Sequence, residues 1–262
     1  MSEAIYVAAS GALVQEMRLE MLSNNLANID TIGFKEDRAI FSNYIAGDQN
    51  RNISTDPELL TSDEPKSVFP YLLSNTQVKF EGTKINFSQG SIRQTGNHLD
   101  FALEGDGFFC IETPQGIQQY TRKGNFRLNE DGKLVTQDGL LVLGDRGSSI
   151  EINGRNVTVD DDGNISVDGN NIDRLKVADF KKPYSLLKAG DASFICADPV
   201  MTETEAKGAR VRQGFVELSN VDPIKVITEM IEVNRAYESY QKIMRSMDEV
   251  ISKSINEVGG TT

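Results

Sequence analysis

An apolar repeat in alternating steps of four and three residues runs through the C-terminal part of the chain. Its members are Val226, Met230, Val233, Tyr237, Tyr240, Met244, Met247 and Ile251. Such a repeat predicts a helix with one apolar stripe, with Asn220 or Asp222 as the cap and Pro223 in the first turn. The predicted helix, residues 223–257, would be roughly 50 Å long at 1.5 Å per residue. A small domain cannot cover a helix of that length, so the stripe is expected to pack against a partner helix.

A second and shorter repeat occupies the N-terminal end. Apolar or small residues recur there, with a polar interruption at Gln15, and they are Ile5, Ala8, Ala12, Leu19, Leu22 and Leu26. This pattern predicts a helix over residues 3–28. The alanines are small enough to let a neighbouring helix approach closely. Asp30, Thr31 and Gly33 bring turn chemistry, so the helix is expected to end near Asn28.

Between the two helices the apolar period falls toward two, and Asp-Gly pairs become frequent. These features predict short antiparallel strands joined by tight turns. The stretch 125–134 matches the stretch 156–165 in pattern, which predicts two equivalent hairpins. Their turns should hold Gly132 and Gly163 at positive φ, whereas Gly147 is expected to lie outside such a turn.

These patterns predict an α+β fold of four parts. Residues 1–35 form an N-terminal helix with a hinge, and residues 36–66 form an irregular segment whose part 42–66 is a polar, mobile loop. Residues 67–218 form a central, mainly antiparallel β domain, and residues 219–262 form the C-terminal helix. The two terminal helices are expected to make a coiled-coil-like layer.

Charge and hydropathy exclude some classes of function. The formal net charge of −12 argues against a nucleic-acid backbone as the main partner, because little on the chain would neutralise phosphates. The sequence contains no run of about 18 apolar residues, so no membrane helix is predicted. The first residues lack the basic region of a cleavable secretory signal. The chain is therefore expected to stay in the cytoplasm or to leave by a route that does not use such a signal.

Residues that could carry chemistry are few. His98, the only histidine, lies beside a predicted turn, and Cys110 and Cys196 lie in separate apolar stretches and are expected to be unpaired core residues. The acidic run 160–163 lacks the ligand spacing and the closing glutamate of a calcium loop. The glycines at 105 and 107 precede a predicted strand, not a phosphate-binding helix. We predict no catalytic residue, no cofactor, no metal site and no small-molecule substrate.

The stretch 24–35, Asn-Asn-Leu-Ala-Asn-Ile-Asp-Thr-Ile-Gly-Phe-Lys, resembles the N-terminal signature of flagellar axial proteins, the bacterial rod and hook family. The stretches 95–109 and 120–126 resemble the family's central strand and its next hairpin. The stretches 214–221 and 236–238 resemble its C-terminal block. Together these similarities span nearly the whole chain in the expected order.

This resemblance implies a structural subunit of the flagellar basal-body rod and not an enzyme. Its partners would be copies of itself, other rod proteins and the flagellar type III export apparatus. It would leave the cell without a cleaved signal peptide and reside in the periplasmic rod. Residues 142–144, 174–180 and 188–190 look most similar to proximal rod subunits. Distal rod subunits are the near alternative, and a ligand-binding or enzymatic β domain with coiled-coil arms is the remote one.

Assembly is predicted to use the two helix stripes and the hinge between the first helix and the β domain. The helices are expected to be partly disordered in a free subunit and to fold on assembly. In the hinge, asparagines bond backbone groups at the helix end, while glycine at positive φ lets a phenylalanine turn into a core. Besides the C-terminal stripe, the predicted assembly residues are Leu19, Leu22, Asn24, Asn25, Leu26, Asn28, Gly33, Phe34 and Asn220.

Overall fold

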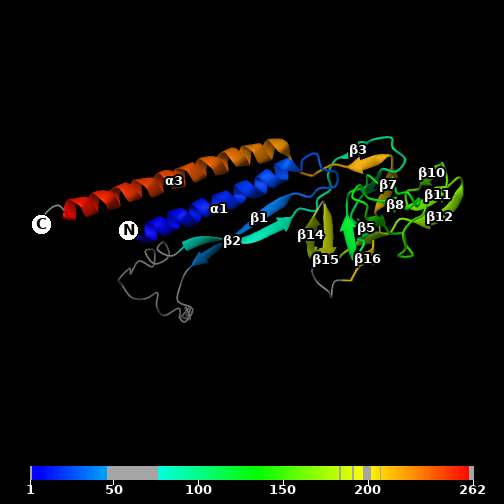
Figure 1. Cartoon of the computed structure of the whole chain (residues 1–262), viewed down its shortest axis with the longest axis horizontal. Coiled ribbons are helices and arrows are strands. Elements are labelled where there is room, and N and C mark those ends of the chain that lie inside the picture. Colours follow the sequence, from blue (N-terminus) through cyan, green and yellow to red (C-terminus); the bar gives the residue numbers. More distant parts are fainter. Residues whose placement is uncertain are drawn as a thin grey trace, which may run out of the picture. The chain divides into compact units, whose positions relative to one another are not determined.

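The computed structural model of this chain describes residues 2–45, 76–182, 184–190, 192–196, 202–206 and 208–259. It has the predicted α+β fold (Figure 1). A long helix stands at each end of the chain, and the antiparallel strands come between the two helices in the sequence. Helix α1 spans Ser2–Ala27 and helix α3 spans Pro223–Gly259. Both helices therefore lie where the apolar repeats predicted them, to within two residues at each end.

The chain forms two compact units. The helical unit contains the described residues of the ranges 1–24, 37–84 and 224–262, and the β unit contains those of the ranges 25–36 and 85–223. Residues 25–36, which we predicted to belong with the N-terminal helix, are therefore part of the β unit. Residues 76–84, which we predicted to belong to the β domain, are part of the helical unit.

The helical unit combines α1 and α3 with a two-stranded sheet of β1, Asp37–Ile45, and β2, Thr76–Ile85. The start of α1 and the end of α3 lie at the same end of the unit, so the two helices run antiparallel (Figure 1). Strand β1 differs from the irregular structure predicted from residue 36 onward. Its sequence contains aromatic and β-branched residues, which favour strands. We nevertheless predicted irregular structure there, because the residues that follow are polar. Residues 46–66 of the predicted loop lie outside the described part of the chain.

The β unit is built on one long sheet with the strand order β14-β15-β6-β5-β9-β8-β7, and β13 pairs with both β5 and β16. Smaller sheets join β10, β11 and β12, then β17 with β4, and β18 with β3. These pairs are antiparallel, as predicted. The strands are β3 Ile92–Gln94, β4 Phe101–Glu104, β5 Phe108–Glu112, β6 Gln118–Thr121, β7 Arg127–Leu128, β8 Leu134–Val135, β9 Leu141–Val142, β10 Val157–Val159, β11 Asn164–Val167, β12 Asn170–Arg174, β13 Val177–Asp179, β14 Leu186–Gly190, β15 Ser193–Cys196, β16 Thr204–Glu205, β17 Arg210–Gln213 and β18 Phe215–Glu217.

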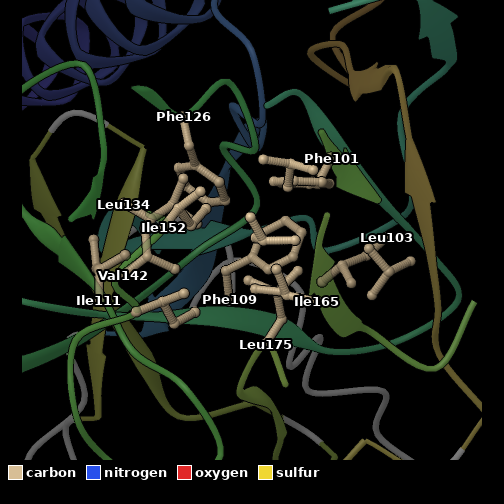
Figure 2. Close-up of a cluster of buried hydrophobic side chains, with 14 residues drawn as sticks. Phe101, Leu103, Phe109, Ile111, Phe126, Leu134, Val142, Ile152, Ile165 and Leu175 are labelled. Carbon is tan, nitrogen blue, oxygen red and sulfur yellow. The ribbon is translucent and has the colours of Figure 1, made fainter. Parts of the chain in front are cut away.

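Strand β5 stands between two apolar clusters, because successive side chains of a strand point to opposite faces. Phe109 and Ile111 enter the larger cluster, which Figure 2 shows with residues from several other strands around them. Phe108 and Cys110 enter a second cluster on the other face. The two clusters thus bury β5 on both faces, and this strand forms the centre of the β unit.

The two predicted hairpins share one turn design. At the first turn position, Asn129 Oδ1 or Asp160 Oδ1 accepts hydrogen bonds from the backbone N–H groups two and four residues further on. The fourth position is Gly132 or Gly163, with φ of 74° and 83°. A side chain at such a φ is strained, which explains the glycine in both copies. The prediction of equivalent hairpins is confirmed.

The prediction for Gly147 was wrong. Its φ is also 74°, and its backbone N–H donates to Gly144 O at 2.8 Å, so it closes a tight turn of its own. The sequence there reads Arg-Gly and lacks the Asp-Gly signal, although glycine supplies the required conformation in either context.

Candidate functional site

The predicted stripe of α3 is also the least exposed line along that helix. Val226 and Val233 are buried, and the other six stripe residues are half-buried, whereas most of the intervening positions are exposed. A repeat that is apolar every three to four residues produces this pattern because those positions share one face of a helix. The structure therefore places all eight predicted residues in one row.

The matching face of α1 is made of small residues. Ala8 and Ala12 are buried, and Gly11 lies between them. A Cβ atom added to Gly11 would lie only 2.6 Å from the ring of Tyr240, so the absence of a side chain is what admits that ring. This contact confirms that α3 approaches α1 closely at its small residues, and Figure 1 shows the two helices side by side.

A second apolar row on α3 was not predicted as a separate feature. Ile224, Ile227 and Ile231 follow the same three-and-four spacing but are exposed by 78%, 47% and 50%. On α1, Tyr6 and Leu13 are exposed by 71% and 52% and lie seven residues apart. We call these five residues the outer rows. Sequence periodicity could have found them, because two apolar rows on one helix predict two packed faces.

The hinge stretch folds tightly against the β unit. Gly33 has φ of 69°, and its N–H donates to Glu217 O at 2.8 Å. A Cβ atom at Gly33 would lie 2.5 Å from the backbone of Arg122 and Lys123, so the position excludes any side chain. Phe34 is buried next to it, with Lys188 Nζ 4.1 Å from its ring centroid. Gly33 thus has the predicted positive φ, and Phe34 is buried as predicted.

Beside Phe34, a buried ion cluster joins three distant parts of the chain. Lys35 Nζ lies 2.6 Å from Glu217 Oε1, and Arg122 Nη1 lies 3.1 Å from Glu217 Oε2. The side chains of Lys35, Arg122 and Glu217 are 1%, 3% and 0% exposed. Lys35 also donates to Ser88 O, and Glu217 Oε1 also accepts from Gly90 N–H. Two cations therefore share one carboxylate, with additional hydrogen bonds that hold both partners in place.

Burial shapes the electrostatics of this cluster. It lowers the pKa of Lys35 below its usual value, the Glu217 carboxylate opposes that shift, and Arg122 adds to it. Arg122 Nη2 donates to Gly105 O at 2.7 Å, and the Arg122 carbon Cζ lies 5.4 Å from the Phe108 ring centroid. Every partner thus comes from a different segment, which fixes the hinge to the β unit.

Asn220 has a different role from the predicted cap of α3. Its Oδ1 accepts the backbone N–H of Glu36 at 2.8 Å, and its Nδ2 donates to Asn86 O and Ser88 O at 2.8 and 3.0 Å. Asn86 Nδ2 in turn donates to Glu36 Oε2 at 2.9 Å. The side chain of Asn220 therefore connects the hinge to the segment before β3, which no local pattern in the sequence indicates.

The structure divides the predicted assembly residues between the two units. Leu19, Leu22, Asn24 and the α3 stripe belong to the helical unit, and Asn25, Leu26, Asn28, Gly33, Phe34 and Asn220 belong to the β unit. Asn24 is exposed, Asn25 is buried, and Asn28 Oδ1 accepts the Thr31 hydroxyl. Sequence reasoning missed Lys35, Arg122 and Glu217, although each stands in a stretch that resembles the family, and Glu217 is a charge between two apolar residues.

Residues with possible chemistry have structural roles. Both thiols are free, as predicted, and burial raises the pKa of Cys110 to about 12. Asp160 bonds its own turn and the Asn164 amide. Within the described ranges, no group of three or more His, Cys, Asp or Glu is placed to hold a metal, and no helix is long and apolar enough to cross a membrane.

Three family models match this chain. They are "Flagella basal body rod protein" over residues 5–35, "Flagellar hook protein FlgE/F/G D1 domain" over residues 102–167, and "Flagellar basal body rod FlgEFG protein C-terminal" over residues 212–257. The first and third matches cover α1 with the hinge and most of α3. The second covers the centre of the β unit. The models thus match both helices and the β strands between them.

Curated relatives are similar to the chain along its whole length. The flagellar basal-body rod protein FlgF of Rhizobium meliloti is 33% identical over 265 residues, covering 100% of both chains. FlgF of Caulobacter vibrioides is 32% identical, covering 99% of both chains. FlgG of the same organism is also 32% identical, covering 95% of this chain and 97% of its own. The similarity identifies a family and does not separate its FlgF branch from its FlgG branch.

Proposed function

This chain belongs to the family of flagellar basal-body rod proteins, and we propose that it assembles into the rod through its two terminal helices. It is a structural subunit of the rod, located in the flagellar basal body. We further propose that it occupies the proximal rod, that the flagellar type III apparatus exports it, and that its partners there are its own copies and other rod proteins.

The outer rows are the observation that carries helix-based assembly. The α3 stripe is buried or half-buried within one copy of the chain, whereas Ile224, Ile227 and Ile231 are exposed by 78%, 47% and 50%. Burying one such side chain contributes roughly 1.5 to 3 kcal/mol. Three such residues on one helix face, with Tyr6 and Leu13 on the other helix, supply a driving force for contact with another chain. This arrangement favours a polymer in which each helix pair is surrounded by neighbours.

The proximal position rests on sequence features. The stretches 142–144, 174–180 and 188–190 resemble proximal subunits, and the polar residues 42–66 differ from the hydrophobic segment expected in distal ones. Complementation tests this assignment: the chain should restore motility to a strain that lacks FlgF and not to one that lacks FlgG. The opposite result would assign it to the distal rod.

Partial disorder of the helices in the free subunit stays a prediction. Hydrogen exchange on dilute monomer tests it, because a folded helix pair would protect the amides of residues 226–251. Weak protection is expected before assembly. Strong protection would show that the pair is already formed.

A charge in the outer row tests the assembly proposal. Ile227→Asp should keep the chain out of isolated basal bodies and abolish swimming, because an unpaired carboxylate in a buried helix contact is strongly unfavourable. Ser239→Asp is the matched control, since Ser239 is exposed on α3 eight residues beyond Ile231, the last residue of the outer row on this helix. It should assemble normally. Normal rods from Ile227→Asp would refute assembly through this row.

A further inference from the structure

The sequence contains a single Asn-Gly pair, Asn153-Gly154, which lies between the two equivalent hairpins. Asparagine is among the chemically labile residues of proteins. The backbone nitrogen of the next residue can attack its side-chain amide carbon, and glycine hinders that attack least because it has no Cβ atom. Both residues are exposed and stand outside the described helices and strands. Solvent and base therefore reach the pair.

The attacking nitrogen is free in the fold. Within the described part of the chain, neither the Gly154 N–H nor the side-chain amide of Asn153 makes a hydrogen bond. Three of the Asp-Gly pairs differ, because Gly132, Gly139 and Gly163 donate their N–H groups to turn carbonyls at 3.1, 3.0 and 3.0 Å. A nitrogen that already donates must break that bond before it can lose its proton and attack. The fold thus protects those three pairs and leaves Asn153-Gly154 unprotected.

Packing requires the glycine at position 154. A Cβ atom there would lie 2.5 Å from Asp168 Oδ2 and would also overlap the buried side chain of Val167. Asp168 is held in place, because its carboxylate accepts the backbone N–H groups of Arg155 and Asn156. A bulkier residue after Asn153 would slow the attack, but the fold excludes it.

We propose that Asn153 is a site of spontaneous deamidation. The Gly154 nitrogen loses its proton and bonds to Asn153 Cγ, and the side-chain nitrogen leaves as ammonia. Water then opens the resulting succinimide ring at either of its carbonyl carbons. Cleavage at Cγ gives aspartate, whereas cleavage at the backbone carbonyl carbon gives isoaspartate, in which the main chain runs through the side chain. Water is the only co-reactant, and nothing is oxidised or reduced.

The reaction changes the chain beside the first hairpin. Both products add a negative charge, and isoaspartate also lengthens the main chain by a methylene group. Ile152, the residue before Asn153, donates its N–H to Gly132 O at 2.8 Å. The added length therefore falls next to a bond that holds the turn of this hairpin. The inference goes beyond the proposed function and does not depend on it.

Mass spectrometry of the full chain after incubation at mildly alkaline pH tests the site. Trypsin releases the peptide 147–155, in which Asn153 is the only residue with a side-chain amide. Its mass should rise as NH₂ is replaced by OH, and a carboxyl methyltransferase specific for isoaspartate should label it. The rate in the native chain should be within about threefold of the rate in urea, because an exposed segment without hydrogen bonds opens at almost no cost.

Two controls accompany the measurement. The tryptic peptide 128–133 should stay unchanged, because Asn129 Oδ1 accepts two backbone hydrogen bonds and the next residue is not glycine. Asn153→Gln should abolish the change in peptide 147–155, because the longer side chain closes a ring far more slowly. Conversion of peptide 147–155 alone supports the proposal. A native rate more than about tenfold below the rate in urea, or equal conversion of both peptides, overturns it and leaves the rod function intact.

Discussion

Glu217→Gln is the substitution that most directly tests how the hinge is held. It keeps the volume of the side chain but removes the one negative charge that contacts both Lys35 and Arg122. Two cations would then be buried side by side without a counter-charge. Removing one partner of a buried pair costs about 3 to 5 kcal/mol. For a unit of this size, that corresponds to a fall in Tm of roughly 6 to 20 °C.

Two further variants rank the effect. Lys35→Met should lower the free energy of unfolding less than Glu217→Gln does, because it leaves a balanced ion pair between Arg122 and Glu217. Glu104→Gln is the matched control: Glu104 pairs with Arg212 at 3.2 Å, but both side chains are about half exposed. Surface pairs of this kind contribute about 0 to 1 kcal/mol. Urea unfolding of the full chain followed by far-ultraviolet circular dichroism measures all three, since the chain has no tryptophan.

The destabilisation should also depend on pH. Burial already lowers the pKa of Lys35, and losing Glu217 removes a charge that opposes this shift. Between the lowered pKa and about 10.4, the unfolded chain binds more protons than the folded one, so stability rises with pH. The difference in the free energy of unfolding between the unsubstituted chain and Glu217→Gln should therefore narrow as pH is raised from 7 toward 10. A Glu217→Gln variant as stable as Glu104→Gln would refute the reasoning.

Two further predictions concern single packing positions. Gly11→Val should weaken the helix pair, because its Cβ would lie 2.6 Å from the Tyr240 ring, while Ala9→Val at an exposed position of α1 should have little effect. Hydrogen exchange of α3 in isolated basal bodies distinguishes the two variants, and equal protection in both would contradict the contact. Native Cys110 should resist alkylation at pH 8, because it is fully buried with a pKa of about 12, whereas half-buried Cys196 should react. Rapid labelling of Cys110, detected by mass spectrometry, would show that strand β5 is accessible.

The sequence predicted those features that depend on local periodicity and turn chemistry. The eight-residue stripe placed α3 correctly because spacing along a helix decides which side chains share a face. The paired hairpins followed from Asp-Gly turns. Strand β1 was missed, since its four strand-favouring residues, Ile40, Phe41, Tyr44 and Ile45, stand among polar residues next to a long polar stretch.

The ion cluster could not be predicted in the same way. Lys35 and Glu217 are 182 positions apart, and no periodic pattern says which distant charges will meet. Their burial follows from the path of the hinge, which depends on Gly33 fitting against the backbone at Arg122. Asn220 shows the same limit: its position suits a helix cap, but three tertiary hydrogen bonds take its amide elsewhere.

The two apolar rows of α3 explain how one helix can serve both the subunit and the polymer. Val226 and Val233 are buried within one copy, so that row packs inside the subunit. Ile224, Ile227 and Ile231 keep about half or more of their surface exposed, and burying it under another chain stabilises the assembly. The charge of −12 opposes that contact at distances up to about a Debye length, near 8 Å in physiological salt. Long-range repulsion and short-range apolar burial together favour assembly where other subunits already hold the chain in position.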